Sequence, residues 1–190
     1  MEIQAIYDEL AGLLEYPGED YAQRVTRCAE ALAQFEGEAA ARLEEFSHRI
    51  AGFSTEALQE LYTETFDLNP ACSLELGWHL FGENYDRGDF LVKMRRELRR
   101  HGLGESRELP DHLTHVLPLL GRMQPEDAET LASLVFAALD KVRAGFKGSE
   151  NPFDLVLEAL VRLLEGRHHR PQLDRPAAPV LRVWDERGLS

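Results

Sequence analysis

Apolar side chains recur at helical spacing along almost the whole chain, and this period constrains the fold more than any other feature. Turn signals separate the apolar stripes, and the clearest are Pro17-Gly18, Asn69-Pro70 and Asn151-Pro152. We see no stretch that alternates in the manner of a half-buried strand. The pattern predicts an all-α, bundle-like single domain of about eight or nine helices over residues 1–166, a length sufficient for a real core.

Several residues predict where individual helices begin and end. Ser54 is a plausible N-cap, and Gly102 fits the glycine position just after a helix. Pro110 fits the first turn of the following helix, and Pro118 should kink or shorten that helix. Gly166 is expected to end the last helix.

The composition changes after Gly166. Residues 167–190 contain three prolines and five arginines and have no sustained period. This composition predicts a flexible C-terminal tail. The alternative is that its VLRVWD stretch, residues 180–185, docks back as a short strand or turn.

The charge of the chain narrows the classes of partner. A formal net charge of -13 argues against nucleic acid and against an anionic membrane surface, because both require basic patches. It suits a basic partner. Cys28 and Cys72 have no disulfide or zinc spacing, the N-terminus is acidic, and no apolar run could span a membrane. We therefore expect a cytoplasmic protein without membrane insertion.

The segment from Leu61 to Gly88 is both acidic and aromatic. Between Glu56 and Asp89 the only base among the acids is Arg87. The segment has no phosphate-binding glycine loop and no nucleophile beside a base. This composition favours a surface that holds another protein over a site of catalysis.

Within that segment, the residues from Ser73 to Phe81 are apolar all round a helical wheel, which predicts a helix at the centre of the bundle. His79 in this helix is expected to be buried and hydrogen-bonded to a neighbour, or else to grip a partner. Asp67 either caps a helix starting at Pro70 or contacts a basic peptide.

Arg87 is expected to form an internal salt bridge to Glu83 or Asp67, since it is surrounded by acids. The aromatic residues of the segment are expected to be core residues, or anchors for an amphipathic helix if a groove exposes them. These aromatic residues are Tyr62, Phe66, Trp78 and Phe81.

Histidines with metal-ligand spacing offer an enzyme alternative, a small helical metalloprotein. Glu45 and His48 are predicted to face water, opposite the apolar stripe of their helix. Glu165 is followed at the same spacing by His168, which lies beyond the expected helix end and should be solvated. His112 and His115 are expected to flank the apolar face as solvated side chains. We therefore predict no metal site.

Three motifs resemble a known family. LYTETFDL (61–68), WHLFGENYDRGDFLVKM (78–94) and ELPDHL (108–113) are similar to the NarJ family, or nitrate reductase delta subunit, within the TorD-like redox-enzyme maturation chaperones. The resemblance implies an all-α cytoplasmic chaperone without catalytic activity or a cofactor of its own. Its partner would be the apo catalytic (alpha) subunit of respiratory nitrate reductase, held by its basic N-terminal segment during molybdenum cofactor insertion.

The candidate peptide-binding residues lie in the matched motifs and would line a groove with an acidic rim. They are Tyr62, Phe66, Asp67, Trp78, His79, Phe81, Glu83 and Arg87. The alternative outside the chaperone class is a structural or accessory helical subunit that stays in a redox complex.

Overall fold

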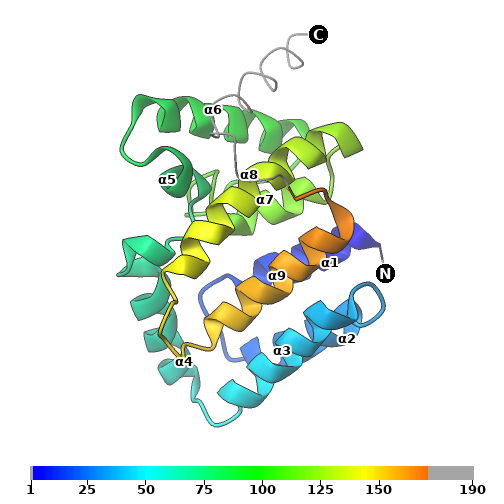
Figure 1. Cartoon of the computed structure of the whole chain (residues 1–190), viewed down its shortest axis with the longest axis vertical. Helices are drawn as coiled ribbons and strands as arrows, with labels where there is room; N and C mark the ends of the chain where they lie inside the picture. The colour runs from blue at the N-terminus through cyan, green and yellow to red at the C-terminus, as the bar shows by residue number, and fades with distance from the viewer. Residues whose placement is uncertain (1, 171–190) are drawn as a thin grey trace.

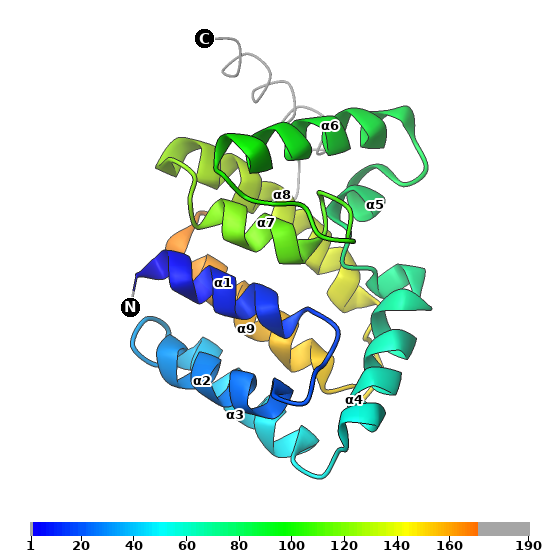
Figure 2. The same cartoon turned by 180° about the vertical axis from the view of Figure 1, so that it is seen from behind.

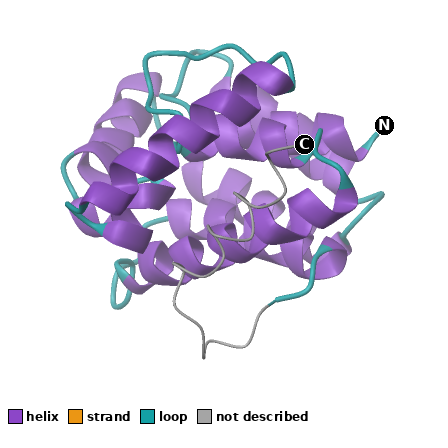
Figure 3. Cartoon of the chain, turned by 90° about the horizontal axis from the view of Figure 1, so that it is seen from above, coloured by secondary structure: helices purple, strands orange, loops and turns teal. Residues whose placement is uncertain are grey.

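Nine α-helices make up most of residues 2–170, the part of the chain that the computed structural model describes (Figure 1). The prediction of an all-α fold with eight or nine helices is confirmed, and Figure 3 shows helices and loops without a strand in this part of the chain. The helices are α1 (Ile3–Leu13), α2 (Tyr21–Leu32), α3 (Gly37–Ile50), α4 (Thr55–Tyr62), α5 (Leu76–Phe81), α6 (Tyr85–Arg100), α7 (Leu113–Leu120), α8 (Pro125–Ala144) and α9 (Phe153–Arg167).

The helices are stacked in successive layers. Figure 2 shows α6 at one end, then α7 and α8, then α1 and α9, and finally α2 and α3 at the other end. The packed pairs agree with this order, because α3 contacts α9, α1 contacts α7 and α2, and α5 contacts α8. Helix α4 lies on one side of the stack beside the α2–α3 end, and residues 63–72 after it lead on toward α5 (Figures 1 and 2).

One continuous apolar core joins the layers. Large side chains from several layers are almost fully buried in it, which is the expected outcome of amphipathic helices that face one another. Among them are Tyr21, Phe46, Phe90, Phe136 and Phe153. None of the helices in residues 2–170 has both the length and the apolar character that a membrane crossing requires.

Two predicted helix ends are confirmed. The Ser54 hydroxyl accepts a hydrogen bond from the Ala57 N–H at 3.2 Å and caps α4. Gly102 follows α6 with a φ of 68°, a left-handed conformation that glycine adopts without a steric penalty. The Leu103 N–H then donates to the Leu98 carbonyl at 2.9 Å, which completes the usual glycine C-cap.

Two short helices follow α4 before the chain turns. Residues Thr63–Asp67 form a π-helix, and Pro70–Cys72 form a 3-10 helix. The predicted break at Asn69-Pro70 is confirmed. Asn69 caps the 3-10 helix by accepting from the Ala71 N–H at 3.2 Å, so of the two roles left open for Asp67 the cap is not the one it has.

The prediction of a central helix from Ser73 to Phe81 is wrong. Helix α5 has 6 residues, lies at the edge of the stack, and buries fully only Leu76 and Gly77 (Figure 1). Its other apolar side chains are half-buried, because the helix contacts α6 on one side and α8 on another instead of being enclosed. Burial was predicted from the apolar side chains on all sides of the helix. This composition does not reveal that the helix has only 6 residues, too few for other helices to surround it.

Two other predicted ends are wrong by a few residues. Pro110 was expected in the first turn of α7, but it precedes this helix by a turn and His112 is the N-cap. The prediction for Pro118 in the same helix is confirmed, because Pro118 lies inside α7 and the helix is only 8 residues long. Helix α9 continues through Gly166 to Arg167, since this glycine keeps a helical conformation beside Glu36.

His168 was expected to be solvated, and this prediction is wrong. Its ring lies 3.0 Å from the Tyr7 hydroxyl and 2.7 Å from a Glu129 carboxylate oxygen, which joins the end of α9 to α1 and α8. The predicted domain limit at residue 166 stays a prediction. Residues 171–190, including the VLRVWD stretch, lie outside the described residues.

Candidate functional site

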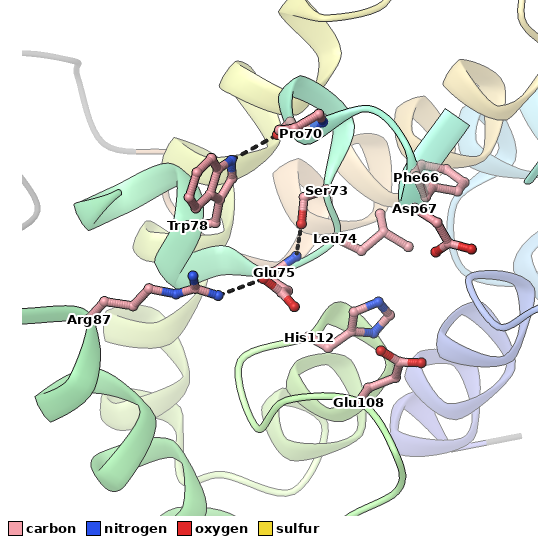
Figure 4. A pocket seen from close by; sticks show the side chains of 10 residues that line it. All are labelled: Phe66, Asp67, Pro70, Ser73, Leu74, Glu75, Trp78, Arg87, Glu108 and His112. Carbon is pink, nitrogen blue, oxygen red and sulfur yellow. Dashed lines mark hydrogen bonds and ion pairs between the residues drawn. The ribbon is translucent and has the colours of Figure 1, made fainter. Parts of the chain in front are cut away.

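A pocket of about 410 Å³ opens where the motif segments meet. Its walls come from the π-helix, the 3-10 helix, the start of α5, the start of α6 and the loop before α7 (Figure 4). The lining residues are Phe66, Asp67, Pro70, Ser73, Leu74, Glu75, Trp78, Arg87, Glu108 and His112.

The π-helix sets the direction of Phe66 and Asp67. The Thr65 hydroxyl is buried and bonds to the Leu61 carbonyl, and it accepts from the Asn151 side-chain amide at 2.6 Å. Asn151 also accepts from the Phe153 N–H at 3.0 Å at the start of α9. This bridge holds Phe66 in the core and leaves the neighbouring Asp67 exposed at the pocket.

A cation and an aromatic ring form one end of the pocket. Arg87 donates to the Glu75 carboxylate at 2.6 Å, and its guanidinium carbon lies 5.8 Å from the Trp78 ring centroid (Figure 4). The Trp78 indole N–H donates to the Pro70 carbonyl at 2.8 Å. Arg87 therefore forms the predicted internal salt bridge, but its partner is Glu75 instead of Glu83 or Asp67.

Near the end of the pocket formed by Arg87 and Trp78, Asp111 is fully buried. It caps α5 although it lies in a distant part of the sequence. Its carboxylate accepts from the Gly77 N–H at 2.8 Å, and its carbonyl accepts from the Leu76 N–H at 3.0 Å. A side chain at Gly77 would meet this carboxylate, since a Cβ there would lie 2.6 Å from the Asp111 Oδ2. Burial raises the pKa of Asp111, although the Gly77 bond and the Arg87 charge counteract that rise.

Two acids form the opposite end of the pocket. Figure 4 shows Asp67 and Glu108 on the side away from Arg87 and Trp78. Both carboxylates are close enough to act on the buried Tyr62 hydroxyl, whose pKa is raised by burial and further by Asp67, Glu108 and Glu15. This end therefore presents a negative field to a ligand.

His112 lines the acidic end, and the prediction that it is solvated is wrong. It is 6% exposed, and its Nδ1 accepts from the Thr114 N–H at 3.3 Å. Burial lowers the pKa of His112 to about 4, with a smaller contribution from His115. The neutral ring is therefore the form that belongs to the folded protein at neutral pH.

His115 was also expected to be solvated, and it is 7% exposed. The Ser106 N–H donates to its Nε2 at 3.0 Å, and its Nδ1 lies 3.0 Å from the Leu109 carbonyl. This histidine therefore fastens the loop that carries Glu108. Helical periodicity missed His115 because the loop before α7 bonds to its ring, and it missed His112 because this residue is the N-cap of α7 and pairs with Glu75 of a distant segment.

Exposed apolar side chains follow the two acids of the pocket in the sequence. Leu68 directly follows Asp67 and is 72% exposed, and Leu109 directly follows Glu108 and is 38% exposed. Each acid thus has an apolar neighbour in the sequence. The surface suits a ligand that combines apolar and basic side chains.

Four of the eight predicted site residues line this pocket: Phe66, Asp67, Trp78 and Arg87. Tyr62 instead lies in the core behind Phe66 and donates to the Leu14 carbonyl at 2.9 Å. Tyr62, His79 and Phe81 therefore do not line this pocket beside Phe66.

The other three predicted residues lie on or just after α5. His79 is half-buried, its Nε2 lies 2.7 Å from the Ser73 carbonyl, and burial lowers its pKa. The predicted hydrogen bond is confirmed. Phe81 packs against Phe90 with ring centroids 5.4 Å apart, and Glu83 is exposed. The pocket residues missing from the prediction are Pro70, Ser73, Leu74, Glu75, Glu108 and His112, of which Glu108 and His112 could have been found in the ELPDHL motif.

The histidine and acid pairs considered as metal ligands are not assembled into a site. His48 is exposed, as predicted, and Glu165 and His168 make separate contacts. Across residues 2–170, no group of three or more histidine, cysteine or acidic side chains is placed to hold a metal ion.

Comparison with known proteins identifies the family. Residues 29–154, more than half of the chain, match the family described as nitrate reductase delta subunit. The chain is 31% identical over 155 residues to the nitrate reductase molybdenum cofactor assembly chaperone NarJ of Escherichia coli (strain K12), which covers 80% of this chain and 66% of that protein. It is 26% identical over 165 residues to the probable chaperone of the same name in Bacillus subtilis (strain 168), covering 85% of this chain and 89% of that protein.

A further relative is the probable nitrate reductase molybdenum cofactor assembly chaperone NarW of Escherichia coli (strain K12), 29% identical over 152 residues, or 80% of this chain and 64% of that protein. The chain thus spans about two thirds of the length of the E. coli relatives. All of these relatives are named as assembly chaperones and not as catalysts. The matched region includes all three motifs and all of the pocket, so the chain belongs to the nitrate reductase delta subunit family.

Proposed function

We propose that this protein is a cytoplasmic assembly chaperone of nitrate reductase. It binds the apo catalytic (alpha) subunit through a basic, helix-forming N-terminal segment and assists molybdenum cofactor insertion before it dissociates. It acts by binding and needs no cofactor of its own. The names of the relatives support the class of function, and the pocket supports the type of ligand.

The observation that carries the proposal is the combination of acids and apolar side chains at one end of the pocket. An apolar side chain of the peptide enters the pocket and lies over the buried Phe66 and Leu74, while a neighbouring lysine or arginine lies near Asp67 and Glu108. Such pairing sets register and association rate more than affinity, whereas the apolar contact supplies most of the binding free energy.

The opposite end of the pocket supports the same class of ligand. The Arg87 charge is already paired with Glu75 and stacked on Trp78, so it does not repel a basic peptide as an unpaired cation would. Trp78 remains half-buried and offers an aromatic surface to an apolar side chain.

The test is calorimetric titration of the full chain with a roughly 25-residue peptide from the N-terminus of the alpha subunit of the same organism. We expect one-to-one binding that weakens between about 50 and 300 mM salt, because screening reduces the attraction between exposed charges. Asp67→Asn with Glu108→Gln should flatten this salt dependence. Absence of binding by the folded protein, or equal salt dependence in the double variant, would contradict the proposal.

Affinity purification from cells separates a chaperone from a permanent subunit. The chaperone should be recovered with the apo catalytic subunit and be absent from the mature, cofactor-loaded enzyme. Stoichiometric retention in the mature enzyme would instead identify an accessory subunit.

A further inference from the structure

The outer face of α6 carries two large apolar side chains that the proposed function does not use. Tyr85 is 86% exposed and Val92 is 65% exposed. At about 100° per residue, Tyr85, Val92 and Arg99 lie within roughly 20° of one line along the helix. The buried residues of α6 lie on the opposite face: Phe90, Met94, Glu97 and Leu98.

Single exposed apolar side chains are common and need no explanation. Leu68 and Leu109, moreover, adjoin acids of the pocket. Tyr85 and Val92 differ because they share one face of one helix at a spacing of two turns. Helix α6 lies at the end of the stack, and no other helix of the described residues covers this face (Figures 1 and 2).

The same face changes the sign of its charge at its midpoint. Asp89 is exposed in the N-terminal half, and Arg96 and Arg99 are exposed in the C-terminal half. The helix dipole favours acids in the first turn and bases in the last. It does not account for Asp89 and Arg96, which lie beyond those turns, or for the apolar Val92 between them.

We propose that this face is a homodimer interface, in which α6 packs antiparallel against α6 of a second copy across a two-fold axis near Val92. An isologous interface requires a self-complementary surface, and a helix with opposite charges on either side of an apolar centre meets that requirement. In this arrangement Val92 contacts Val92 of the second copy.

The helical geometry assigns the remaining contacts. When the two-fold axis passes near Val92, Asp89 and Arg96 of the second copy lie at nearly the same position along the helix axis. They also lie on the same side of the helix pair, so they can form an ion pair. Tyr85 lies at the height of Arg99 of the second copy, where the guanidinium stacks on the exposed ring. Each contact occurs twice by symmetry.

The current partners of the two arginines leave them available for these contacts. Arg96 pairs only with Glu97, at 3.7 Å, and Arg99 with Glu105, also at 3.7 Å, among the ion pairs recorded for residues 2–170. Arg95, by contrast, donates to Glu105 at 2.8 Å and stays in its own copy. On this side of the helix pair, Arg95 faces Gly88 of the second copy. A Cβ added at Gly88 would meet no atom within 4 Å, so the surface there is open and the two helices can approach closely.

The dimer leaves the proposed peptide pocket accessible. Arg87 points to the inner side of α6 and lines the pocket, whereas Val92 points to the outer side. A contact between two 16-residue helices is smaller than a standard protein interface, so the dimer should dissociate in the micromolar range.

The test is sedimentation velocity of the full chain at low salt over a range of concentrations. We expect a monomer–dimer equilibrium that Val92→Glu abolishes and that Asp89→Arg or Arg96→Asp weakens at least about tenfold, because each reversal places like charges together twice. An equimolar mixture of Asp89→Arg and Arg96→Asp chains should associate again, since each reversed residue then meets an opposite charge.

Glu44→Arg on the exposed face of α3 is the matched control, and it should dimerise as the unchanged chain does. Circular dichroism should give the same helix content for every variant. A monomer at all concentrations, a dimer that survives the reversals, or a mixture that fails to associate would overturn the inference. Val92→Glu should still bind the alpha-subunit peptide one to one, so failure of the dimer and failure of the chaperone proposal are separate results.

Discussion

Asp111 shows how one motif residue can support the fold while its neighbours line the pocket. Its buried carboxylate and carbonyl satisfy the first two N–H groups of α5, which has no side-chain cap from its own segment. On either side of it, Glu108 and His112 line the pocket. The ELPDHL motif therefore combines a support for α5 with two pocket residues.

Asp111→Ala should destabilise the fold by about 1–3 kcal/mol, because the Gly77 N–H loses its acceptor in a buried place. Asp111→Asn keeps an oxygen acceptor and should lose much less, since burial already disfavours the charged form. Urea unfolding of both variants at pH 7 measures the difference. Equal losses would mean that the charge, and not the cap, is what the fold requires.

His112 makes the stability of the fold depend on pH. Its Nδ1 accepts from the Thr114 N–H only while it is unprotonated, and the Thr114 hydroxyl lies 2.8 Å from the same nitrogen. Because its folded pKa is lowered from 6.5 to about 4, the unfolded chain binds more protons between these values. Stability therefore rises with pH across this window and falls as pH drops from 6.5 to 4.

We expect His112 to account for about 3 kcal/mol of stability lost between pH 6.5 and pH 4. His112→Asn retains an acceptor at the N-cap of α7 and cannot titrate, so its stability should fall less over this range. As the pH falls, Asp111 increases stability because its pKa is raised, and His79 decreases stability because its pKa is lowered. Both effects are present in the unchanged chain and in the variant, so they cancel in the comparison. Parallel curves of unfolding free energy against pH would contradict the assignment.

At the scale of elements, the π-helix between α4 and the turn is the least expected part of the fold. It is closed by a hydrogen bond from the Leu68 N–H to the Thr63 carbonyl at 2.9 Å. The Asn151 amide holds it through Thr65 from the start of α9. The direction of Asp67 thus depends on a residue more than 80 positions later in the chain.

Thr65→Val should cost about 1–2 kcal/mol, because the Asn151 amide loses a buried acceptor. It should also weaken peptide binding and reduce its salt dependence as Asp67→Asn does, since the acid is no longer held at the pocket. Thr63→Val makes the same chemical change in the same π-helix at a half-buried position and serves as the control. Hydrogen exchange at the Leu68 amide reports on the π-helix directly. Protection that is equal in both variants would show that Thr65 does not maintain it.

At the scale of the whole molecule, a formal charge of -13 attracts any basic peptide from a distance. Specific binding requires more, namely acids held beside apolar surface. The stack of helices brings this about by joining residues 66–87 to residues 108–112 around one pocket.

A comparison at constant net charge separates these two contributions. Asp67→Asn with Glu108→Gln should slow peptide association by about fivefold or more and change the dissociation rate less, because these exposed acids act mainly on register and association rate. Glu30→Gln with Glu44→Gln removes the same charge from exposed sites on α2 and α3 and should change the association rate by about twofold or less. Stopped-flow fluorescence with a labelled peptide measures both rates. Equal effects of the two pairs would show that only the total charge matters.

The sequence by itself determined the all-α class and several helix boundaries. Helical periodicity depends on each segment having one apolar face, and capping depends on a few adjacent residues, so both can be read locally. Ser54 and Gly102 were predicted correctly for this reason. The motifs likewise located Phe66, Asp67, Trp78 and Arg87 at the pocket.

Only the tertiary structure decided which side chains are covered and by what. The loop before α7 bonds to the buried His115, and α5 lies at the edge despite its apolar composition. Arg87 pairs with Glu75 instead of Glu83, which is nearer in the sequence. The physical reason is the same in each case. Burial and ion pairing depend on elements that are distant in the chain, and a helical wheel contains no information about them.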